Sequence, residues 1–222
     1  VLLANSQYIQ KRIKRIYARS VVRIKLGVTD SEVIKSKREN FYLTVGPLTV
    51  FKGMDFLVKA IAHLPKEKRH PLIVVANAGR DKTYIQNLAK KLNVELKIVS
   101  NIYKGIDDKK LIDLYKKAKL FLFAPFNEPF GLVVLEAMSY GLPVVGVNEG
   151  GLKEMIENNK NGWLVNRDPK AFSKTIVKAL GLIDNNFRIA TRNTTKKWQW
   201  NKSALEMEKL LEKISRTNEK QN

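Results

Sequence analysis

The sequence predicts an α/β protein with a Rossmann-like, doubly wound parallel sheet. Two observations predict it: short apolar or β-branched runs alternate with amphipathic stretches, and these runs are apolar almost throughout. Alternating strand and helix is typical of a parallel sheet covered by helices on both faces. Strands that are buried on both faces read as continuous apolar runs. A chain of 222 residues can bury about 70% of the surface that its unfolded form exposes, enough for one large domain.

The predicted elements alternate along the chain. Strands are expected at Val21–Ile24, Phe41–Val45, Leu72–Ala76, Leu96–Val99, Leu120–Ala124, Val144–Val147 and Trp163–Val165. Helices are expected at Asp55–His63, Thr83–Leu92, Asp107–Ala118, Phe130–Tyr140, Leu152–Glu157, Pro169–Leu182 and Asn201–Ile214. Asp107 is a suitable N-cap residue, and Gly141 followed by Pro143 is a typical helix end.

A short segment with its own strand and helix precedes the main domain. Val1–Ala4 is expected to be a strand, and a helix with apolar residues on one face follows it. We therefore expect residues 1–19 to be the tail of a preceding domain with a linker and helix, residues 20–215 to be the main domain, and residues 216–222 to be a frayed polar tail. Because the chain starts at valine, we expect that it was cut from a longer protein.

The composition excludes several classes of site. The chain has no cysteine, which excludes disulfides, thiolate catalysis and cysteine-bound zinc and fits a reducing compartment. No apolar run approaches the roughly 18 residues of a membrane-spanning helix, and no signal peptide is visible, so we expect a cytoplasmic protein. The sequence also has no paired histidines for a metal, no nucleophilic serine elbow and no Walker-type phosphate loop.

The net charge is strongly positive. It is +20, from 41 Lys and Arg against 21 Asp and Glu, and such an excess attracts nucleic acid, anionic lipid or phosphorylated substrates. Residues 1–25 contain no acid and carry the cations Lys11, Arg12, Lys14, Arg15, Arg19, Arg23 and Lys25. The aromatic platforms of single-strand binders are not apparent, so nucleic acid is not an expected partner, whereas an anionic membrane surface is. Lysines elsewhere in the chain are interpreted as a solvated surface.

Glycine-bearing turns follow three of the predicted strands. They are Gly46-Pro47 with Lys52-Gly53, Pro129-Phe130-Gly131, and Asn148-Glu149-Gly150-Gly151. Open parallel sheets bind ligands beyond the carboxyl ends of their strands, and glycine lets the backbone approach a ligand closely. One such turn is compatible with ordinary loop structure, but their combination indicates a binding site.

Two carboxylates lie at the start and in the middle of the helix predicted after Pro129. Glu128 lies at its mouth and Glu136 eight positions further on. Because Pro129 to Glu136 spans close to two turns, both acids are expected on one side of the helix, roughly 10 Å apart along its axis. A helix start favours a phosphate, and carboxylates accept hydrogen bonds from hydroxyls, so the spacing suits a nucleotide diphosphate-sugar. Alternatively, Glu128 only stabilises the helix N-terminus and Glu136 lies on a thin exposed strip.

Together these motifs resemble a known family. The stretch Glu128-Pro-Phe-Gly-Leu-Val-Val-Leu-Glu136 is similar to the E-x(7)-E signature of retaining GT-B glycosyltransferases of the "glycosyl transferases group 1" family, also called family 4. Further similar stretches are Val45-Gly46 with Lys52-Gly53, Ala137–Val145, Asn148–Glu154, Asn161–Val165 and Trp200. The resemblance covers roughly residues 20–215 and implies the C-terminal, nucleotide-sugar-binding half of a GT-B fold.

The resemblance implies a role for each motif. Glu128 and Lys52 are the expected catalytic residues: Glu128 contacts hydroxyls of the donor sugar, and Lys52 neutralises the diphosphate. Glu136 is expected to bind the ribose hydroxyls, and Tyr103 to flank the base. The other expected donor-binding residues are Gly46, Phe130, Gly131, Leu132, Val133, Gly150 and Gly151. The family retains the anomeric configuration of the sugar and uses neither a divalent metal nor a cofactor.

Two stretches depart from the family pattern. Pro47 stands where the family usually has an arginine, so one cation for the diphosphate is missing unless Arg80 supplies it. Ala76-Asn77-Ala78-Gly79 stands where the family often has Gly-x-Gly. The amino-terminal, acceptor-binding domain of the family is not in this sequence, so the chain alone is expected to bind donor weakly and to transfer little or nothing.

The sequence therefore predicts the donor-binding domain of a retaining hexosyltransferase. Its partners would be a nucleotide diphosphate-sugar, a missing N-terminal acceptor domain, and a glycan or lipid-linked acceptor. We expect it in the cytoplasm, with peripheral attachment to the inner face of the membrane. Two alternatives stay open: a non-catalytic basic module on an anionic membrane, and a silent partner subunit, for which Pro47 is the argument.

Overall fold

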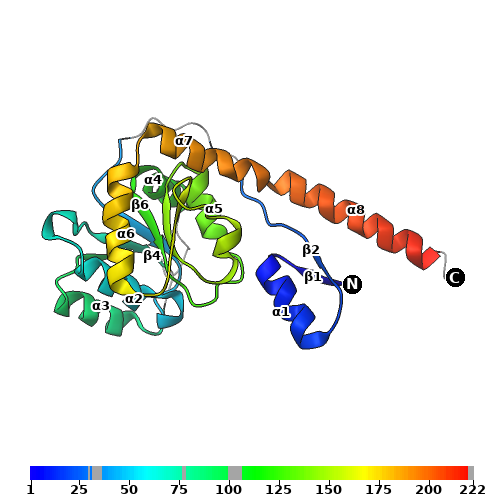
Figure 1. Ribbon diagram of the computed structural model, residues 1–222, viewed down its shortest axis with the longest axis horizontal. Coiled ribbons are helices and arrows are strands. Elements are labelled where there is room, and N and C mark those ends of the chain that lie inside the picture. The colour runs from blue at the N-terminus through cyan, green and yellow to red at the C-terminus, as the bar shows by residue number, and fades with distance from the viewer. Residues whose placement is uncertain (30, 32–36, 77–78, 100–106, 220–222) are drawn as a thin grey trace.

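Six parallel strands form one sheet, as the alternation of strands and helices predicts (Figure 1). In the computed structural model, which describes residues 1–29, 31, 37–76, 79–99 and 107–219, the strand order is β5-β4-β3-β6-β7-β8. The bounds are Tyr42–Val45 for β3, Leu72–Val75 for β4, Leu96–Val99 for β5, Leu120–Phe123 for β6, Val144–Val147 for β7 and Gly162–Val165 for β8. The predicted Rossmann-like α/β fold is confirmed.

The order of the strands reverses at β3. The chain runs outward from β3 through β4 to β5, returns to the other side of β3, and runs outward again through β6, β7 and β8. β3 pairs with β6 at Tyr42–Leu120 and Leu43–Phe121. The carboxyl ends of β3 and β6 therefore flank a topological switch point, which is where open α/β sheets bind their ligands.

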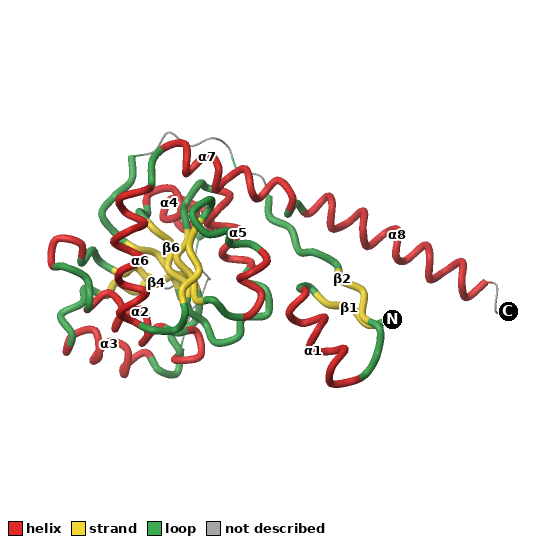
Figure 2. The backbone as a smooth tube through the Cα atoms, viewed as in Figure 1, coloured by secondary structure: helices red, strands yellow, loops and turns green. Residues whose placement is uncertain are grey.

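Helices cover both faces of the sheet (Figure 2). α2 packs against α3 and α6, and α5 packs against α7; the tube drawing places α2 and α6 on one side of the strands and α5 on the other. The bounds are Met54–Ala62 for α2, Lys82–Lys91 for α3, Asp108–Lys117 for α4, Leu132–Ser139 for α5, Pro169–Leu182 for α6 and Asn185–Asn193 for α7. Short 3-10 helices are η1 (Val50–Lys52), η2 (Lys66–Lys68), η3 (Gly150–Glu154) and η4 (Thr194–Lys197). Every residue of β6 and β7 is buried between these layers, which explains their apolar sequences.

Local signals explain where several helices begin. The Asp107 carboxylate accepts a hydrogen bond from the Lys109 amide at 3.0 Å, which confirms the predicted N-cap. Asp168 accepts one from the Ala171 amide at 2.6 Å, and Pro169 occupies the first position of α6.

Several elements differ from the predictions. α5 begins at Leu132 rather than at Phe130, because Gly131 adopts a left-handed φ of 95°. Glu128 therefore precedes the helix, and its position comes from the turn after β6, so the expected spacing of both acids along one helix does not apply. The predicted helix at residues 152–157 is the 3-10 helix η3. α7 is not among the predicted helices, although Asp184 caps it.

The first residues form a separate small unit. β1 (Leu2–Ala4) and β2 (Val21–Arg23) pair in parallel, and α1 (Gln7–Tyr17) connects them. The strand expected at Val21–Ile24 is confirmed, but the expectation that it is the first strand of the main sheet is wrong. It pairs with β1 instead, in a two-stranded sheet of its own. This unit contacts the main domain through Glu154, whose carboxylate accepts hydrogen bonds from the Tyr8 amide at 3.1 Å and from Arg23 at 3.2 Å.

The last helix, α8 (Trp200–Glu219), is longer than predicted and extends away from the main sheet on the side of the β1–α1–β2 unit (Figure 1). Among the described residues, no helix is both long and apolar enough to cross a membrane.

Candidate functional site

Most of the predicted site residues gather at the switch point between β3 and β6. The segment after β3 carries Gly46, Lys52 and Gly53, and the segment after β6 carries Glu128. The second glycine turn, at the end of β7, lies against the segment after β6. Three separate stretches of the chain therefore meet at one edge of the sheet, as expected for parallel strands.

The 3-10 helix η1 places the Lys52 side chain. Asp81, at the start of α3, accepts a hydrogen bond from the Val50 amide at 2.9 Å. The Thr49 hydroxyl accepts one from the Lys52 amide at 3.3 Å. Both bonds satisfy amides at the start of the short helix, so the backbone that carries Lys52 is held from two sides.

Lys52 and Glu128 form an ion pair across the switch point. The distance from Lys52 Nζ to Glu128 Oε2 is 2.8 Å, between residues 76 positions apart in the sequence. The Glu128 side chain is 15% exposed and the Lys52 side chain 34% exposed, so both groups are within reach of a ligand. An ammonium can pair with a phosphate, and a carboxylate accepts hydrogen bonds from hydroxyls. The structure thus brings together the two predicted catalytic residues.

Gly53 allows the two loops to approach closely. Its φ is +69°, and a Cβ atom added there would lie 1.9 Å from the Ala124 carbonyl oxygen. Next to it, the Phe126 amide donates a hydrogen bond to the Phe51 carbonyl at 2.9 Å. Backbone therefore packs on backbone between the Lys52 loop and the segment that leads to Glu128, which leaves no room for a side chain.

The second glycine turn holds the peptide of Glu128. Gly150 has φ +58°, and a Cβ atom there would lie 2.2 Å from the Glu128 carbonyl oxygen. The Gly151 amide donates a hydrogen bond to that same oxygen at 2.8 Å. Both glycines therefore contact the main chain of Glu128 and hold it in place. Their direct contact with a donor stays a prediction.

The N-terminus of α5 has no side-chain cap. Phe130 is buried before it, with its ring edge-on to Trp198 at a centroid distance of 5.5 Å. Leu132 and Val133, in the first turn, are partly buried. An uncapped helix start presents amides to an anion, which agrees with the predicted use of this turn.

Glu136 lies inside α5 and contacts α4. Its Oε2 accepts a hydrogen bond from the Tyr115 hydroxyl at 3.0 Å. Burial raises the pKa of Glu136 above its ordinary value, and the bond from Tyr115 opposes this rise. Tyr115 is not among the site residues predicted from the sequence, although it contacts Glu136 directly. No contact joins Glu136 to Glu128 in the described structure.

Arg167, which is not among the site residues predicted from the sequence, links the loops of the site. Its guanidinium donates to the Ala124 and Pro125 carbonyls at 2.9 and 2.8 Å and to Glu149 at 2.7 Å. It also lies 3.7 Å from the centroid of the Phe126 ring. The hydrogen bond from Arg167 holds the pKa of Glu149 below its ordinary value. Its position in the sequence could have indicated this role, because Arg167 follows β8 and therefore lies at the same edge of the sheet as the other site residues.

Arg80 lies beside the Lys52 loop, as a replacement for the missing arginine requires. Its guanidinium carbon is 5.2 Å from the centroid of the Phe51 ring, next in sequence to Lys52. Its side chain is 68% exposed, and its nearest carboxylate oxygen, on Asp81, is 3.9 Å away. Pro47 is exposed in the same loop. A role of Arg80 in binding a phosphate stays a prediction.

Tyr103, the predicted neighbour of the base, lies outside the described residues. Within the described ranges, no group of three His, Cys, Asp or Glu side chains is placed to hold a metal ion.

Comparison with known proteins identifies relatives. The family model described as "Glycosyl transferases group 1" matches residues 29–198. The chain is 32% identical over 187 residues to an uncharacterized glycosyltransferase of Methanocaldococcus jannaschii, covering 82% of this chain and 45% of that protein. It is 31% identical over 197 residues to D-inositol 3-phosphate glycosyltransferase of Xylanimonas cellulosilytica, covering 86% of this chain and 44% of that protein. The chain thus spans less than half the length of these relatives.

The fold is also found in solved structures. The crystal structure of Anabaena HepE in complex with UDP-glucose superposes with a TM-score of 0.79 at 19% identity, covering 96% of this chain and 64% of HepE. At this identity the likeness concerns the fold, and it confirms the predicted GT-B type of α/β architecture.

Proposed function

Because this chain belongs to the glycosyl transferases group 1 family, we propose that it is the donor-binding half of a retaining hexosyltransferase. Its donor is a nucleotide diphosphate-sugar, and its acceptor is a glycan or a lipid-linked sugar. The acceptor site belongs to an amino-terminal domain, so this chain alone binds donor weakly and transfers little. Its place is the cytoplasm or the inner face of the membrane.

The observation that carries this proposal is the Lys52–Glu128 pair at the switch point. A diphosphate-sugar presents anionic oxygens next to a ring of hydroxyl donors, and the pair offers a cation and a hydrogen-bond acceptor 2.8 Å apart. The uncapped start of α5 at Leu132, four residues after Glu128, adds amides that favour an anion. UDP-glucose bound to HepE, a protein of the same fold, also supports this class of donor.

The proposed reaction keeps the configuration of the sugar. The bond between the anomeric carbon and the diphosphate oxygen breaks, and a bond to the acceptor oxygen forms on the same face. The proton of the acceptor hydroxyl passes to the departing diphosphate. Lys52 stabilises the charge that develops on the leaving group, and Glu128 orients the sugar through its hydroxyls. Glu136 accepts hydrogen bonds from the ribose.

Calorimetry tests the proposal directly. UDP-, GDP- and ADP-sugars are titrated into the wild-type chain, into Glu136→Ala, and into Glu95→Ala as a matched control, because Glu95 is an exposed carboxylate that forms an ion pair with Lys97. We expect one nucleotide class to bind the wild type and the Glu95 variant alike, and Glu136→Ala to bind it less tightly. Equal binding by Glu136→Ala, or no binding across the panel, contradicts the proposal.

Metal independence is a separate part of the proposal. Titrations of the wild-type chain in the presence of EDTA and in the presence of Mg²⁺ or Mn²⁺ test it. We expect the same donor affinity in each case. Affinity that is lost in EDTA and restored by one of the metals contradicts this part.

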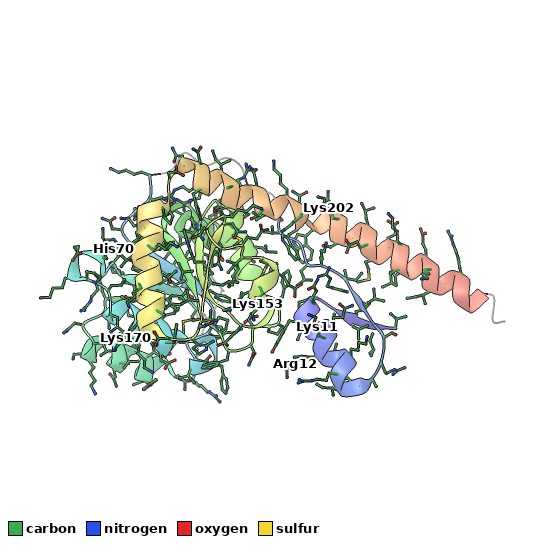
Figure 3. All side chains as sticks on the ribbon, in the orientation of Figure 1. Lys11, Arg12, His70, Lys153, Lys170 and Lys202 are labelled. Atoms are coloured by element: carbon green, nitrogen blue, oxygen red, sulfur yellow. The ribbon has the colours of Figure 1, made fainter. Side chains whose placement is uncertain are left out.

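A second candidate function is electrostatic binding to an anionic membrane, which the β1–α1–β2 unit favours. Lys11, Arg12, Lys14 and Arg15 are exposed on α1, and Figure 3 shows Lys11 and Arg12 on this helix, outside the main domain. Anionic leaflets attract such clusters. Sedimentation with vesicles that contain phosphatidylserine should show binding at low salt that disappears at high salt, with phosphatidylcholine vesicles as the control. No binding at low salt rejects this function.

A silent partner subunit is the remaining alternative, and Pro47 is the feature that supports it. The test is a transfer assay on a complete assembly, in which this domain is combined with an acceptor domain from the same chain or from a partner. If donor binds and no transfer occurs in that complete assembly, the domain is a binding subunit and not part of an enzyme.

A further inference from the structure

The Tyr115 hydroxyl reaches from α4 to the carboxylate of Glu136 on α5. The Tyr115 side chain is 1% exposed, and its hydroxyl donates to Glu136 Oε2 at 3.0 Å. Glu136 itself is only partly buried. A fully buried phenol therefore supports one oxygen of a carboxylate that solvent can reach.

The neighbours of Tyr115 hold it in place. Its ring stacks on Tyr140 at a centroid distance of 5.7 Å and an interplanar angle of 10°. The Arg38 guanidinium donates to the Tyr115 carbonyl at 2.5 Å, at the end of α4, and to the Tyr140 carbonyl at 2.8 Å, at the end of α5. Arg38 thus ties together the two helices that carry the hydroxyl and the carboxylate.

We propose that Tyr115 is a positioning residue for nucleotide binding: its hydroxyl occupies Glu136 Oε2, so that Oε1 is presented to the ribose diol. This inference rests on the proposed function, in which Glu136 accepts the ribose hydroxyls. A carboxylate has two oxygens that accept hydrogen bonds. When one is fixed by a rigid donor, fewer rotamers are lost on binding, and affinity gains from this preorganisation.

The charges around Glu136 give the inference a pH signature. Tyr115 and Asp108 from α4 act on Glu136, Glu136 in turn acts on Tyr140 from α5, and Lys116 lies over the Tyr140 ring. Burial and Asp108 raise the pKa of Glu136, whereas the hydrogen bond from Tyr115 lowers it. Removing that hydroxyl therefore raises the pKa of Glu136 further, and the carboxylate is protonated at a higher pH.

The test is a titration of wild type, Tyr115→Phe, Glu136→Gln and the double variant. The probes are the diphosphate among UDP, GDP and ADP that binds the wild type, and its 2′,3′-dideoxy form. Tyr140→Phe is the control, because it removes the other hydroxyl of the stacked pair, which makes no hydrogen bond to Glu136 in the described structure. We expect Tyr115→Phe to weaken the ribonucleotide about fivefold, the equivalent of one net hydrogen bond, and to leave the dideoxy form unchanged.

The double variant and the pH profile separate positioning from general support of the fold. In the Glu136→Gln background, Tyr115→Phe should have no further effect on affinity. The ratio of wild-type to Tyr115→Phe affinity, in which the ionisation of the nucleotide cancels, should rise as the pH falls into the range where Glu136 becomes protonated in the variant alone.

Three results would overturn the inference. They are equal weakening of the ribonucleotide and the dideoxy form, an equal effect of Tyr140→Phe, and a ratio that does not change with pH. If the wild type binds none of the nucleotides, the proposed function fails and this inference with it. If the wild type binds but Tyr115→Phe binds equally well, only the role of Tyr115 fails.

Discussion

Arg167 and Glu149 are joined by two hydrogen bonds, from Nε to Oε1 at 2.7 Å and from Nη2 to Oε2 at 2.8 Å. This bidentate pair is the strong form of an ion pair, and its Arg167 side chain is only 17% exposed. The same guanidinium donates to the carbonyls of Ala124 and Pro125. One side chain therefore connects the end of β8, the turn after β7, and the strand end that leads to Glu128.

Replacing this clamp should destabilise the protein. We expect Arg167→Met to lower the free energy of unfolding by about 2–3 kcal/mol, because it leaves a partly buried carboxylate and two carbonyls without their donor. Urea unfolding measures this. Arg216→Met is the control, since the Arg216 side chain is 77% exposed and its loss should cost less than about 0.5 kcal/mol. Similar losses in both variants would contradict the clamp.

The same pair predicts a dependence of stability on pH. The hydrogen bond from Arg167 depresses the pKa of Glu149 in the folded protein. A depressed pKa contributes stability that is present above the unfolded value, about 4.3 for glutamate, and is lost as the pH falls through the folded value. The difference in unfolding free energy between wild type and Arg167→Met should therefore be larger at neutral pH than at about pH 3. Urea unfolding at both pH values measures it. A constant difference would assign the whole effect to the carbonyl contacts.

Lys52 should matter for ligand binding and little for stability. Lys52→Met removes a partly exposed ion pair, which typically changes stability by less than about 1 kcal/mol. It also removes a charge-assisted bond to the diphosphate, so donor affinity should fall about tenfold or more. Calorimetry with the nucleotide sugar and urea unfolding are the two measurements. Lys174→Met, at an exposed position of α6, should change neither. A Lys52 variant with wild-type affinity would remove Lys52 from the site.

Two glycine substitutions should have opposite effects. At Gly150, with φ +58°, the added methyl of Gly150→Ala would lie 2.2 Å from the Glu128 carbonyl oxygen, so we expect a loss of more than about 2 kcal/mol together with weaker donor binding. At Gly181, inside α6, nothing lies within 4 Å of an added Cβ. Gly181→Ala should stabilise the protein by about 0.5–1 kcal/mol. Thermal or urea unfolding compares them, and a tolerated Gly150→Ala would show that the turn can move away from Glu128.

Sequence patterns were sufficient where the physical cause is local or repeats along the chain. The apolar runs predicted the strands because two-sided burial demands apolar side chains at every position of β6 and β7. Asp107 was recognisable as an N-cap because the bond that it accepts comes from an amide two residues away. The glycine turns predicted the functional edge of the sheet, since parallel strands all end there.

The predictions that were wrong or missing concern β2, the start of α5, and α7, and each has a physical reason. β2 begins with two β-branched valines, which favour a strand in any sheet, so its sequence does not show whether it joins the main sheet or pairs with β1. α5 begins at Leu132 and not at Phe130 because Gly131 adopts a left-handed φ of 95°. Glycine adopts this conformation about as readily as a helical one, so the sequence does not show which it takes. The sequence of α7 is mostly polar after Asp184. Its packing against α5 shows that it is one of the helices that cover the sheet.

By itself the sequence determined the fold class, the family, and the residues that carry the candidate chemistry, because these depend on residue types and short spacings. Only the tertiary structure decided the partners of those residues. Lys52 meets Glu128 because β3 and β6 are neighbours in the sheet, and Tyr115 meets Glu136 because α4 and α5 lie side by side. Contacts of this kind depend on the order of strands and the packing of helices, which bring together residues that no local pattern connects.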